Sequence, residues 1–345
     1  ISGEYYSMTT PDPPQLYEAI KQMSDRKVEY VIMEVSSHAI YYEKISAIKF
    51  ALSIFTNISS EHLDFHRTIE EYVETKLKLV DYSDTVLLNI DDPVLRKAHH
   101  NIIDKNKYGF GILWDADFRV TDICDLEFEG VNFIFPTGMS FAVKSHLVGK
   151  FNIYNTLSAL SASIYLGVKP CIAKQALADF MGAEGRIETI YNKDIRIIID
   201  YAHTEAAFEA LLSSANEYSN GCLSVLFGCG GERYPGKRAK MAKIAEKYAS
   251  RIYVTSDNQR REPLDKIFKD IIDGFSPQCN YCVVEDRNIA ISKAILEAKN
   301  GYTLLLVGKG HERYNLTADG YHHFDEREAV KLAIEERERR HESQT

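Results

Sequence analysis

The sequence predicts an α/β fold made of two domains. Short apolar runs rich in Val, Ile and Leu recur along the chain, and stretches with helical spacing separate them. Such runs are typical of strands buried in a parallel sheet, and their alternation with helices is typical of βαβ units. A chain of 345 residues with 45% hydrophobic residues can form roughly two or three domains with cores of their own, which excludes a disordered or fibrous protein.

In the first half of the chain, the apolar runs predict strands at residues 30–37, 50–57 and 85–91. Helical spacing predicts helices at residues 17–26, 69–80 and 154–167. The block from about residue 107 to residue 147 differs, because it consists of alternating, aromatic and β-branched runs. This pattern favours an antiparallel patch over further βαβ units.

In the second half, the same signals predict strands at residues 196–203, 224–230, 251–258 and 303–310. Helices are expected at residues 205–215, 237–249 and 264–275. The second set of strand–helix units begins after residues 180–186, so we expect domains at 1–182 and 183–345. The charged tail, residues 336–345, is expected to be a solvated, frayed end.

Composition narrows the functions that the chain can have. Lys and Arg total 41 against 50 Asp and Glu, so the net charge of −9 provides no overall basic field for nucleic acid. No apolar run approaches the roughly 20 residues that span a bilayer, and the first residues lack the apolar segment of a signal peptide. We therefore expect a cytoplasmic protein that is not inserted in a membrane.

The six cysteines are spread along the chain, so they are expected to be reduced thiols rather than a disulfide framework. Cys279 and Cys282 form a CxxC pattern. No second CxxC or HxxxH accompanies it, so two ordinary cysteines are favoured over a zinc or redox site.

Polar residues follow the predicted strands, at the edge where open parallel sheets bind ligands. The first strand leads into Glu34, Ser36 and His38, and the second leads towards His62. Carboxylate oxygens with an occasional imidazole suit Mg²⁺, so Glu34 and His62 are candidate ligands.

The strand ends of the second half carry Gly-rich and basic turns at residues 200–204, 227–238, 256–262 and 308–315. The glycines at 228, 230 and 231 do not complete a GxGxxG dinucleotide motif, because Arg233 stands where the last glycine is needed. The turns are expected to be locally basic and to suit a carboxylate-rich or phosphorylated substrate. Their basic residues are Arg233, Lys237, Arg238, Arg260, Lys309 and Arg313.

Ten motifs occur in order over nearly the whole chain. They are TTPDP (9–13), MEVSSHA (33–39), FTNISSEHLDFH (55–66), NIDDP (89–93), GKFNIYN (149–155), GR (185–186), DYAHT (200–204), FGCGGERYPGKR (227–238), DNQR (257–260) and GKGHE (308–312). With these motifs the chain resembles the Mur ligase family, and within it the MurE type, which adds the third amino acid of the peptidoglycan stem peptide.

The resemblance implies a central ATP-binding domain with a mostly parallel sheet and an antiparallel patch, followed by a Rossmann-like C-terminal domain that binds the incoming amino acid. It implies an ATP-dependent carboxylate–amine ligase that uses Mg²⁺. Its substrates would be UDP-MurNAc-L-Ala-D-Glu and a diamino acid, joined through an acyl phosphate, and the enzyme would act as a monomer. Activation by ATP fits the chemistry, because a carboxylate is a poor electrophile until one oxygen becomes a leaving phosphate.

The resemblance also assigns site residues by position. Glu34, His62 and a carbamylated Lys76 match the Mg²⁺ ligands, and the residues that match the ATP contacts are Asn155, Arg186 and Asp200. Thr9, Thr10, Ser36 and Lys44 fall where the muramoyl-peptide is held, and Lys44 occupies a position that is commonly Arg.

Six residues match the amino-acid pocket of the diaminopimelate-adding enzymes: Arg233, Asp257, Asn258, Arg260, Gly308 and Glu312. In this pocket an Arg pairs with the distal carboxylate of meso-diaminopimelate, and Glu312 accepts a hydrogen bond from its distal ammonium. The usual DNPR reads DNQR here, with Gln259 in place of a turn-setting proline. Meso-diaminopimelate is therefore expected, with L-lysine and lanthionine as alternatives.

The sequence contains no GxxxxGK[ST] phosphate-binding loop, and the chain begins at Ile1 only a few residues before TTPDP. We interpret it as a fragment of a ligase and expect the 345 residues alone to have negligible ligase activity. Two alternatives remain open: another member of the superfamily, such as a folylpolyglutamate or cyanophycin synthetase, and a ligase-like module that binds a peptidoglycan precursor or a partner protein.

Overall fold

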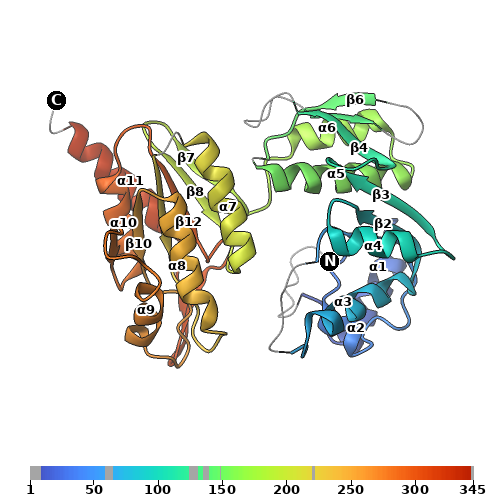
Figure 1. The fold of residues 1–345 in the computed structure, drawn as a ribbon, viewed down its shortest axis with the longest axis horizontal. Helices are drawn as coiled ribbons and strands as arrows, with labels where there is room; N and C mark the ends of the chain where they lie inside the picture. Colours follow the sequence, from blue (N-terminus) through green and yellow to red (C-terminus); the bar gives the residue numbers. More distant parts are fainter. Residues whose placement is uncertain are drawn as a thin grey trace. The chain divides into compact units, whose positions relative to one another are not determined.

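The computed structural model describes residues 9–58, 65–123, 131–134, 140–147, 149–219 and 222–342. The chain divides into two compact units (Figure 1). The first takes its described residues from 1–123, 131–143 and 154–175, and the second from 144–153 and 176–345. Each unit has a six-stranded sheet of its own with helices packed against it, so the predicted α/β class is confirmed.

The sheet of the first unit has the order β1-β2-β3-β4-β5-β6. Its strands are β1 (Phe50–Phe55), β2 (Ser83–Asn89), β3 (Asn106–Gly111), β4 (Phe118–Ile123), β5 (Val131–Ile134) and β6 (Ser140–Val143). The first four are parallel, and β4, β5 and β6 pair antiparallel. The antiparallel patch is therefore confirmed, although β3 still belongs to the parallel part.

The helices of the first unit supply the apolar side chains that cover this sheet. They are α1 (Pro13–Asp25), α2 (Ser37–Tyr41), α3 (Ile69–Leu77), the 3₁₀ turn η1 (Lys78–Val80), α4 (Pro93–Asn101), α5 (Lys150–Tyr165) and α6 (Pro170–Asp179). Leu16 of α1, Tyr72 of α3 and Leu95 of α4 form one cluster with Val86 and Leu88 of β2.

The strand predicted at residues 30–37 is not formed. Residues 30–36 have no regular structure, α2 begins at Ser37, and Ile32 is 97% exposed. A strand exists through hydrogen bonds to a neighbour, and β1, the nearest candidate in chain order, pairs only with β2 among the described residues. An apolar run indicates that burial would be favourable, but it does not specify the partner strand.

The sheet of the second unit has the order β11-β10-β9-β12-β8-β7, parallel except for the antiparallel pair β7–β8. Its strands are β7 (Glu188–Asn192), β8 (Arg196–Asp200), β9 (Leu223–Phe227), β10 (Arg251–Val254), β11 (Tyr281–Val283) and β12 (Thr303–Val307). The four inner strands are those predicted from apolar runs. The edge strands β7 and β11 are only partly buried, which is why their sequences carry a weaker signal.

Helices cover both faces of this sheet, as in a doubly wound fold. They are α7 (Glu205–Tyr218), α8 (Gly236–Tyr248), α9 (Leu264–Ile272), α10 (Arg287–Glu297) and α11 (Glu326–Glu342). Leu305 and Val307 of β12 pack with α7, α8 and α9, whereas Leu304 and Leu306 pack with α10 and α11. Because both faces of β12 are buried, residues 304–307 are all apolar instead of alternating.

The charged tail differs from the prediction, because α11 continues to Glu342. Arg337 is only 4% exposed and donates to Asp194 Oδ2 at 2.9 Å and to the Ile295 carbonyl at 2.6 Å. A buried arginine with such partners is compatible with a packed helix, whereas composition alone suggests a solvated end.

The CxxC residues lie at the edge strand β11. Cys279 packs against the cluster on one face of the sheet and Cys282 against the cluster on the other. Burial raises the pKa of Cys279 to about 11 and also raises the pKa of Cys282, so both thiols are held in the protonated form. In the described part of the chain, no helix is both long and apolar enough to span a bilayer.

Candidate functional site

The TTPDP and MEVSSHA motifs are bound to each other in the first unit. The Thr10 hydroxyl donates to the Glu34 carbonyl at 3.0 Å and accepts from the Ser36 N–H at 3.3 Å. Ser36 caps α2, since its hydroxyl accepts from the Ala39 N–H at 3.1 Å. Three predicted site residues therefore form one turn, with the Glu34 side chain exposed beside it.

Lys44 is tied to the same turn through an ion pair. Its Nζ lies 2.7 Å from Asp12 Oδ1, and the lysine side chain is mostly buried. Asp12 belongs to TTPDP, so Lys44 is held beside the segment that carries Thr10 and the exposed Thr9.

Lys76 lies in the last turn of α3, with its Nζ 5.5 Å from the centre of the Tyr72 ring. That ring packs on the fully buried His66, whose Nε2 is 3.0 Å from the Ser37 hydroxyl of α2. A packed row of side chains thus links α3, which carries Lys76, to α2. The third predicted Mg²⁺ ligand, His62, lies outside the described residues, and those that are described contain no group of three or more acidic, His or Cys side chains suited to a metal.

The NIDDP motif forms a polar turn at the end of β2. The Asp91 carboxylate accepts from the backbone N–H groups of Ile112, Leu113 and Trp114 at 2.6, 3.0 and 3.1 Å. It also accepts from the Tyr154 hydroxyl at 2.8 Å, which places the turn against the part of α5 that carries Asn155.

The next residue, Asp92, caps α4 and receives the Ile58 N–H at 3.0 Å. The NIDDP turn therefore connects the end of β1 with the loop after β3 and with α5. The exposed Asn155 follows Tyr154 directly on that helix.

Replacing Asp91 with alanine is expected to destabilise the first unit by about 2–3 kcal/mol, because four donors lose a charged acceptor. Trp114 is the sole tryptophan and bonds to Asp91, so its fluorescence during urea unfolding measures this effect. Asp115→Ala is the control: Asp115 is almost fully exposed and forms only a surface pair with Arg119, so the change should be below about 0.5 kcal/mol. Equal shifts for both variants would contradict the role of Asp91.

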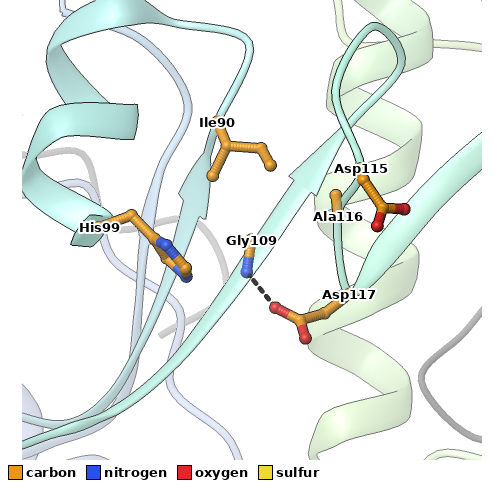
Figure 2. A pocket seen from close by; sticks show the side chains of 6 residues that line it. All are labelled: Ile90, His99, Gly109, Asp115, Ala116 and Asp117. Atoms are coloured by element: carbon orange, nitrogen blue, oxygen red, sulfur yellow. Dashed lines mark hydrogen bonds between the residues drawn. The ribbon is translucent and has the colours of Figure 1, made fainter.

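A surface depression of about 310 Å³ lies beside β3, lined by Ile90, His99, Gly109, Asp115, Ala116 and Asp117 (Figure 2). The Asp117 carboxylate accepts from the Gly109 N–H at 2.7 Å, and burial lowers the pKa of His99. None of the predicted site residues lines it. Asp117 lies in the loop between β3 and β4, and Ile90 belongs to the NIDDP turn.

In the second unit, Asp200 joins the DYAHT motif to the GKGHE motif and to Ile187, which follows the GR motif. Its carboxylate accepts from the Ile187 N–H at 2.8 Å and from the Ala202 N–H at 2.7 Å, and its carbonyl accepts from the Gly308 N–H at 3.0 Å. Burial raises the pKa of Asp200 even though the two N–H groups oppose the shift. Through these hydrogen bonds Asp200 holds the backbone after β8 in place. The neighbouring Arg186 is exposed, with its guanidinium 4.9 Å from the centre of the Tyr201 ring.

Asn258 lies at the centre of the predicted amino-acid pocket. Its Nδ2 donates to Glu312 Oε2 at 2.7 Å, and its Oδ1 accepts from Lys309 Nζ at 2.7 Å. Its backbone N–H donates to Asp257 at 2.6 Å. Gly308 has a φ of +113°, and a Cβ there would lie 2.9 Å from Asp257 Oδ2, so glycine is required. Four predicted residues, Asp257, Asn258, Gly308 and Glu312, are therefore brought together.

Arg260 is aimed by backbone contacts. It has a φ of +54°, and its N–H donates to the Leu316 carbonyl at 2.9 Å. Its Nη1 donates to the carbonyls of Gly231 and Asn258 at 2.9 and 3.1 Å. Leu316 belongs to β13 (Tyr314–Thr317), which pairs with β14 (Gly320–His323) as a small hairpin. This hairpin fixes the turn at Gln259, where the resemblance leads one to expect a proline.

The glycine cluster allows two loops to approach closely. A Cβ at Gly228 would lie 2.4 Å from the Thr255 carbonyl oxygen, and one at Gly231 would lie 1.9 Å from that of Gln259. A Cβ at Gly230 would lie 3.0 Å from Arg260 Nη1 and 3.9 Å from Arg233 Cγ. The glycines thus seat the exposed Arg233 loop against the Arg260 loop.

The expectation of locally basic turns is wrong for several residues. Arg238 is fully buried and pairs with Glu262 at 2.7 Å and Asp270 at 2.8 Å. Lys309 is also fully buried, and Arg313 pairs with Glu184 at 2.6 Å. Composition counts these charges, but only packing shows that carboxylates neutralise them.

The sequence reasoning did not single out Tyr201, although it lies within the DYAHT motif. Its hydroxyl donates to Glu312 Oε1 at 3.2 Å, and burial together with Glu312 raises the pKa of Tyr201 to about 12. Tyr201 therefore links the Asp200 loop to the amino-acid pocket. Its position directly after the candidate residue Asp200 was the available signal.

Two family models match this chain. A family model of the Mur ligase middle domain matches residues 1–163, and one of the Mur ligase glutamate ligase domain matches residues 185–310. The chain is 37% identical over 333 residues to a UDP-N-acetylmuramoyl-L-alanyl-D-glutamate–2,6-diaminopimelate ligase of Clostridium botulinum. The aligned region covers 95% of this chain and 68% of that protein. It is also 37% identical over 341 residues to the protein of the same name from Thermosynechococcus vestitus, covering 97% and 68%.

Solved structures show the same fold. A structure titled with the same ligase name has a TM-score of 0.66 and 28% identity, covering 98% of this chain and 71% of the other. MurF from Thermotoga maritima, solved in complex with ADP, has a TM-score of 0.64 and 19% identity, covering 86% and 64%. The resemblance seen in the motifs is confirmed, and the chain belongs to the Mur ligase family.

Proposed function

We propose that this protein is an ATP-dependent ligase that adds meso-diaminopimelate to the D-Glu carboxylate of UDP-MurNAc-L-Ala-D-Glu in peptidoglycan synthesis. Relatives that are 37% identical are named UDP-N-acetylmuramoyl-L-alanyl-D-glutamate–2,6-diaminopimelate ligase, and four of the residues that match the amino-acid pocket of these enzymes lie together in the second unit. The observation that carries the proposal is that a carboxylate and a guanidinium, those of Glu312 and Arg260, both contact Asn258. Glu312 offers a carboxylate to an ammonium, and Arg260, held by Leu316, Gly231 and Asn258, offers a guanidinium to a carboxylate.

The remaining assignments form part of the same proposal. We propose a central domain at residues 1–182 that binds the nucleotide and the muramoyl dipeptide, and a C-terminal domain at 183–345 that binds the amino acid. Thr9, Thr10, Ser36 and Lys44 would hold the dipeptide substrate. Asn155, Arg186 and Asp200 would contact ATP, and Glu34, His62 and a carbamylated Lys76 would hold Mg²⁺. The enzyme would work as a cytoplasmic monomer.

The residues present fit a metal only in part. The exposed Glu34 carboxylate and the Lys76 helix belong to segments linked by packed side chains, and an oxygen donor such as Glu34 suits Mg²⁺. When bound, Mg²⁺ would neutralise phosphate charge during transfer to the carboxylate. Lys76 adds an oxygen ligand only if its amine is carbamylated, because an ammonium has no lone pair to offer.

In the amino-acid pocket, the residues of this chain bind and orient. Glu312, to which Asn258 donates, would receive the distal ammonium and Arg260 the distal carboxylate of the same carbon, which leaves the amine at the other end to attack the activated D-Glu carbonyl. Fixing the distal end at both of its charged groups limits the freedom of the attacking amine and so raises the probability of reaction.

Amino-acid-dependent release of phosphate from ATP tests the proposal. The complete product of the reading frame is incubated with UDP-MurNAc-L-Ala-D-Glu and either meso-diaminopimelate, L-lysine or lanthionine. We expect release with meso-diaminopimelate at a kcat/KM about 10-fold or more above that for L-lysine, because L-lysine leaves Arg260 without its carboxylate. A preference for L-lysine would contradict the amino-acid assignment, and turnover of none of the three would contradict the ligase assignment.

For the 345 residues alone we expect negligible release, because they contain no phosphate-binding loop.

A further inference from the structure

Lys309 is a fully buried lysine at the end of β12. Lysine is rarely buried unless it is paired. Its Nζ donates to Asn258 Oδ1 and to the Tyr314 carbonyl, both at 2.7 Å, and it lies 3.6 Å from carboxylate oxygens of Asp257 and Glu312. Three of its four polar neighbours are therefore residues assigned to the amino-acid pocket.

The contacts of Lys309 determine which way the Asn258 amide points. The Lys309 ammonium and the Leu316 N–H can only donate, and both face the same end of the Asn258 side chain, at 2.7 and 2.8 Å. That end must therefore be the oxygen. The Nδ2 group is then directed at Glu312 Oε2, 2.7 Å away.

The orientation of Asn258 in turn determines how Glu312 is held. One oxygen of Glu312 accepts from Asn258 Nδ2, and the other accepts from the Tyr201 hydroxyl. Without the Lys309 ammonium, only the Leu316 N–H would hold the Asn258 oxygen in place. A reversed amide would present its oxygen to the Glu312 carboxylate and repel it.

The positive charge of Lys309 also favours the ionised form of Asp257. Burial is the strongest single influence and raises the pKa of Asp257, but the charges of Lys309 and Arg287 together with the Asn258 N–H outweigh it, so the pKa is lowered. Burial lowers the pKa of Lys309 itself, while Asp257 and Glu312 favour its charged form.

We propose that Lys309 is a positioning residue of the amino-acid pocket: it orients Asn258 and thereby fixes the Glu312 carboxylate in the direction from which an incoming ammonium approaches. This inference rests on the proposed function. A lysine that merely filled space could be replaced by an apolar residue of similar shape at little cost to substrate binding.

The first test measures the orientation of Asn258 in the 345-residue chain. In ¹H–¹⁵N spectra, the side-chain amide of Asn258 is identified by its loss in Asn258→Asp. We expect Lys309→Met to move this signal towards the position of a solvated amide. Lys299→Met, at an exposed lysine of the same unit, should leave it in place. An unchanged Asn258 signal in a folded Lys309→Met protein would overturn the proposal.

The second test separates positioning from general loss of structure. In the complete reading-frame product, Lys309→Met should raise the KM for the diamino acid about 10-fold or more while the KM for ATP changes less than about twofold. Equal increases in both KM values would show a structural role only. Lys299→Met should match the parent in both.

Asn258→Asp covers the case in which Lys309→Met does not fold. Aspartate keeps an oxygen for Lys309 and Leu316 but replaces the donor to Glu312 with an acceptor. It should fold and raise the diamino-acid KM by about 10-fold or more, and a parental KM would overturn the proposal. If the parent itself shows no turnover, the proposed function fails, whereas the amide spectrum still decides whether Lys309 orients Asn258.

Discussion

Replacing Arg260 with alanine is expected to raise the KM for meso-diaminopimelate about 10- to 100-fold and to leave the KM for L-lysine nearly unchanged. The range corresponds to about 1.5–3 kcal/mol, the usual contribution of a hydrogen bond between charged groups. L-Lysine lacks the distal carboxylate that Arg260 would bind. A φ of +54° is similarly unfavourable for alanine and for arginine, because both have a Cβ, so the substitution mainly removes the rest of the side chain.

The matched control is Arg261→Ala, which removes an exposed guanidinium one residue further along the chain. It should leave both KM values within about twofold of the parent, as expected for a surface substitution. An equal rise for both amino acids in Arg260→Ala would show that Arg260 supports the loop through the Gly231 and Asn258 carbonyls instead of recognising the substrate carboxylate. Arg260→Lys should recover only part of the affinity, because an ammonium cannot form the bidentate contact.

Replacing Glu326 with alanine is expected to destabilise the second unit by about 3–5 kcal/mol, the cost of leaving a buried charge without its partner. Arg287 and Glu326 are both nearly inaccessible to solvent, and Arg287 Nε and Nη2 donate to Glu326 Oε1 at 2.9 and 2.6 Å. Arg287 also donates to two carbonyls next to the pocket. Ser256 lies just after β10, and Val307 is the last residue of β12.

Denaturant unfolding followed by far-UV circular dichroism measures this loss, and Trp114 fluorescence reports on the first unit in the same samples. Glu328→Ala is the control on the same helix, because Glu328 is exposed and forms a surface pair with His323, and its effect should be within about 1 kcal/mol. Arg287→Met combined with Glu326→Leu should recover much of the lost stability, since an apolar pair removes the unpaired charge. A loss below about 1 kcal/mol for Glu326→Ala would contradict the buried-pair interpretation.

Much of the fold follows from local patterns. The four inner strands of the second sheet coincide with apolar runs, because burial on both faces of a sheet favours apolar side chains. The strands β1 and β2 of the first sheet also coincide with apolar runs. The helices α1, α3, α7, α8 and α9 follow from helical spacing. The strand predicted at residues 30–37 is wrong, since strand formation needs a partner that a local pattern does not specify.

For the site, the sequence by itself determined which chemical groups occur and in what order. The motifs carry Thr10, Glu34, Ser36, Asp257, Asn258, Arg260 and Glu312, and these residues lie in two groups, one at the TTPDP turn and one around Asn258. Only the tertiary structure decided which charges are available. Lys309 and Arg238 belong to the same basic set as Arg260 in the sequence, yet both are buried against carboxylates.

The hairpin β13–β14 likewise holds the Arg260 turn through Leu316, more than 50 residues away along the chain. Burial and long-range hydrogen bonds depend on which segments meet after folding. The sequence therefore determined the residues that a site could use, and packing decided which of them bind a ligand and which hold the others in place.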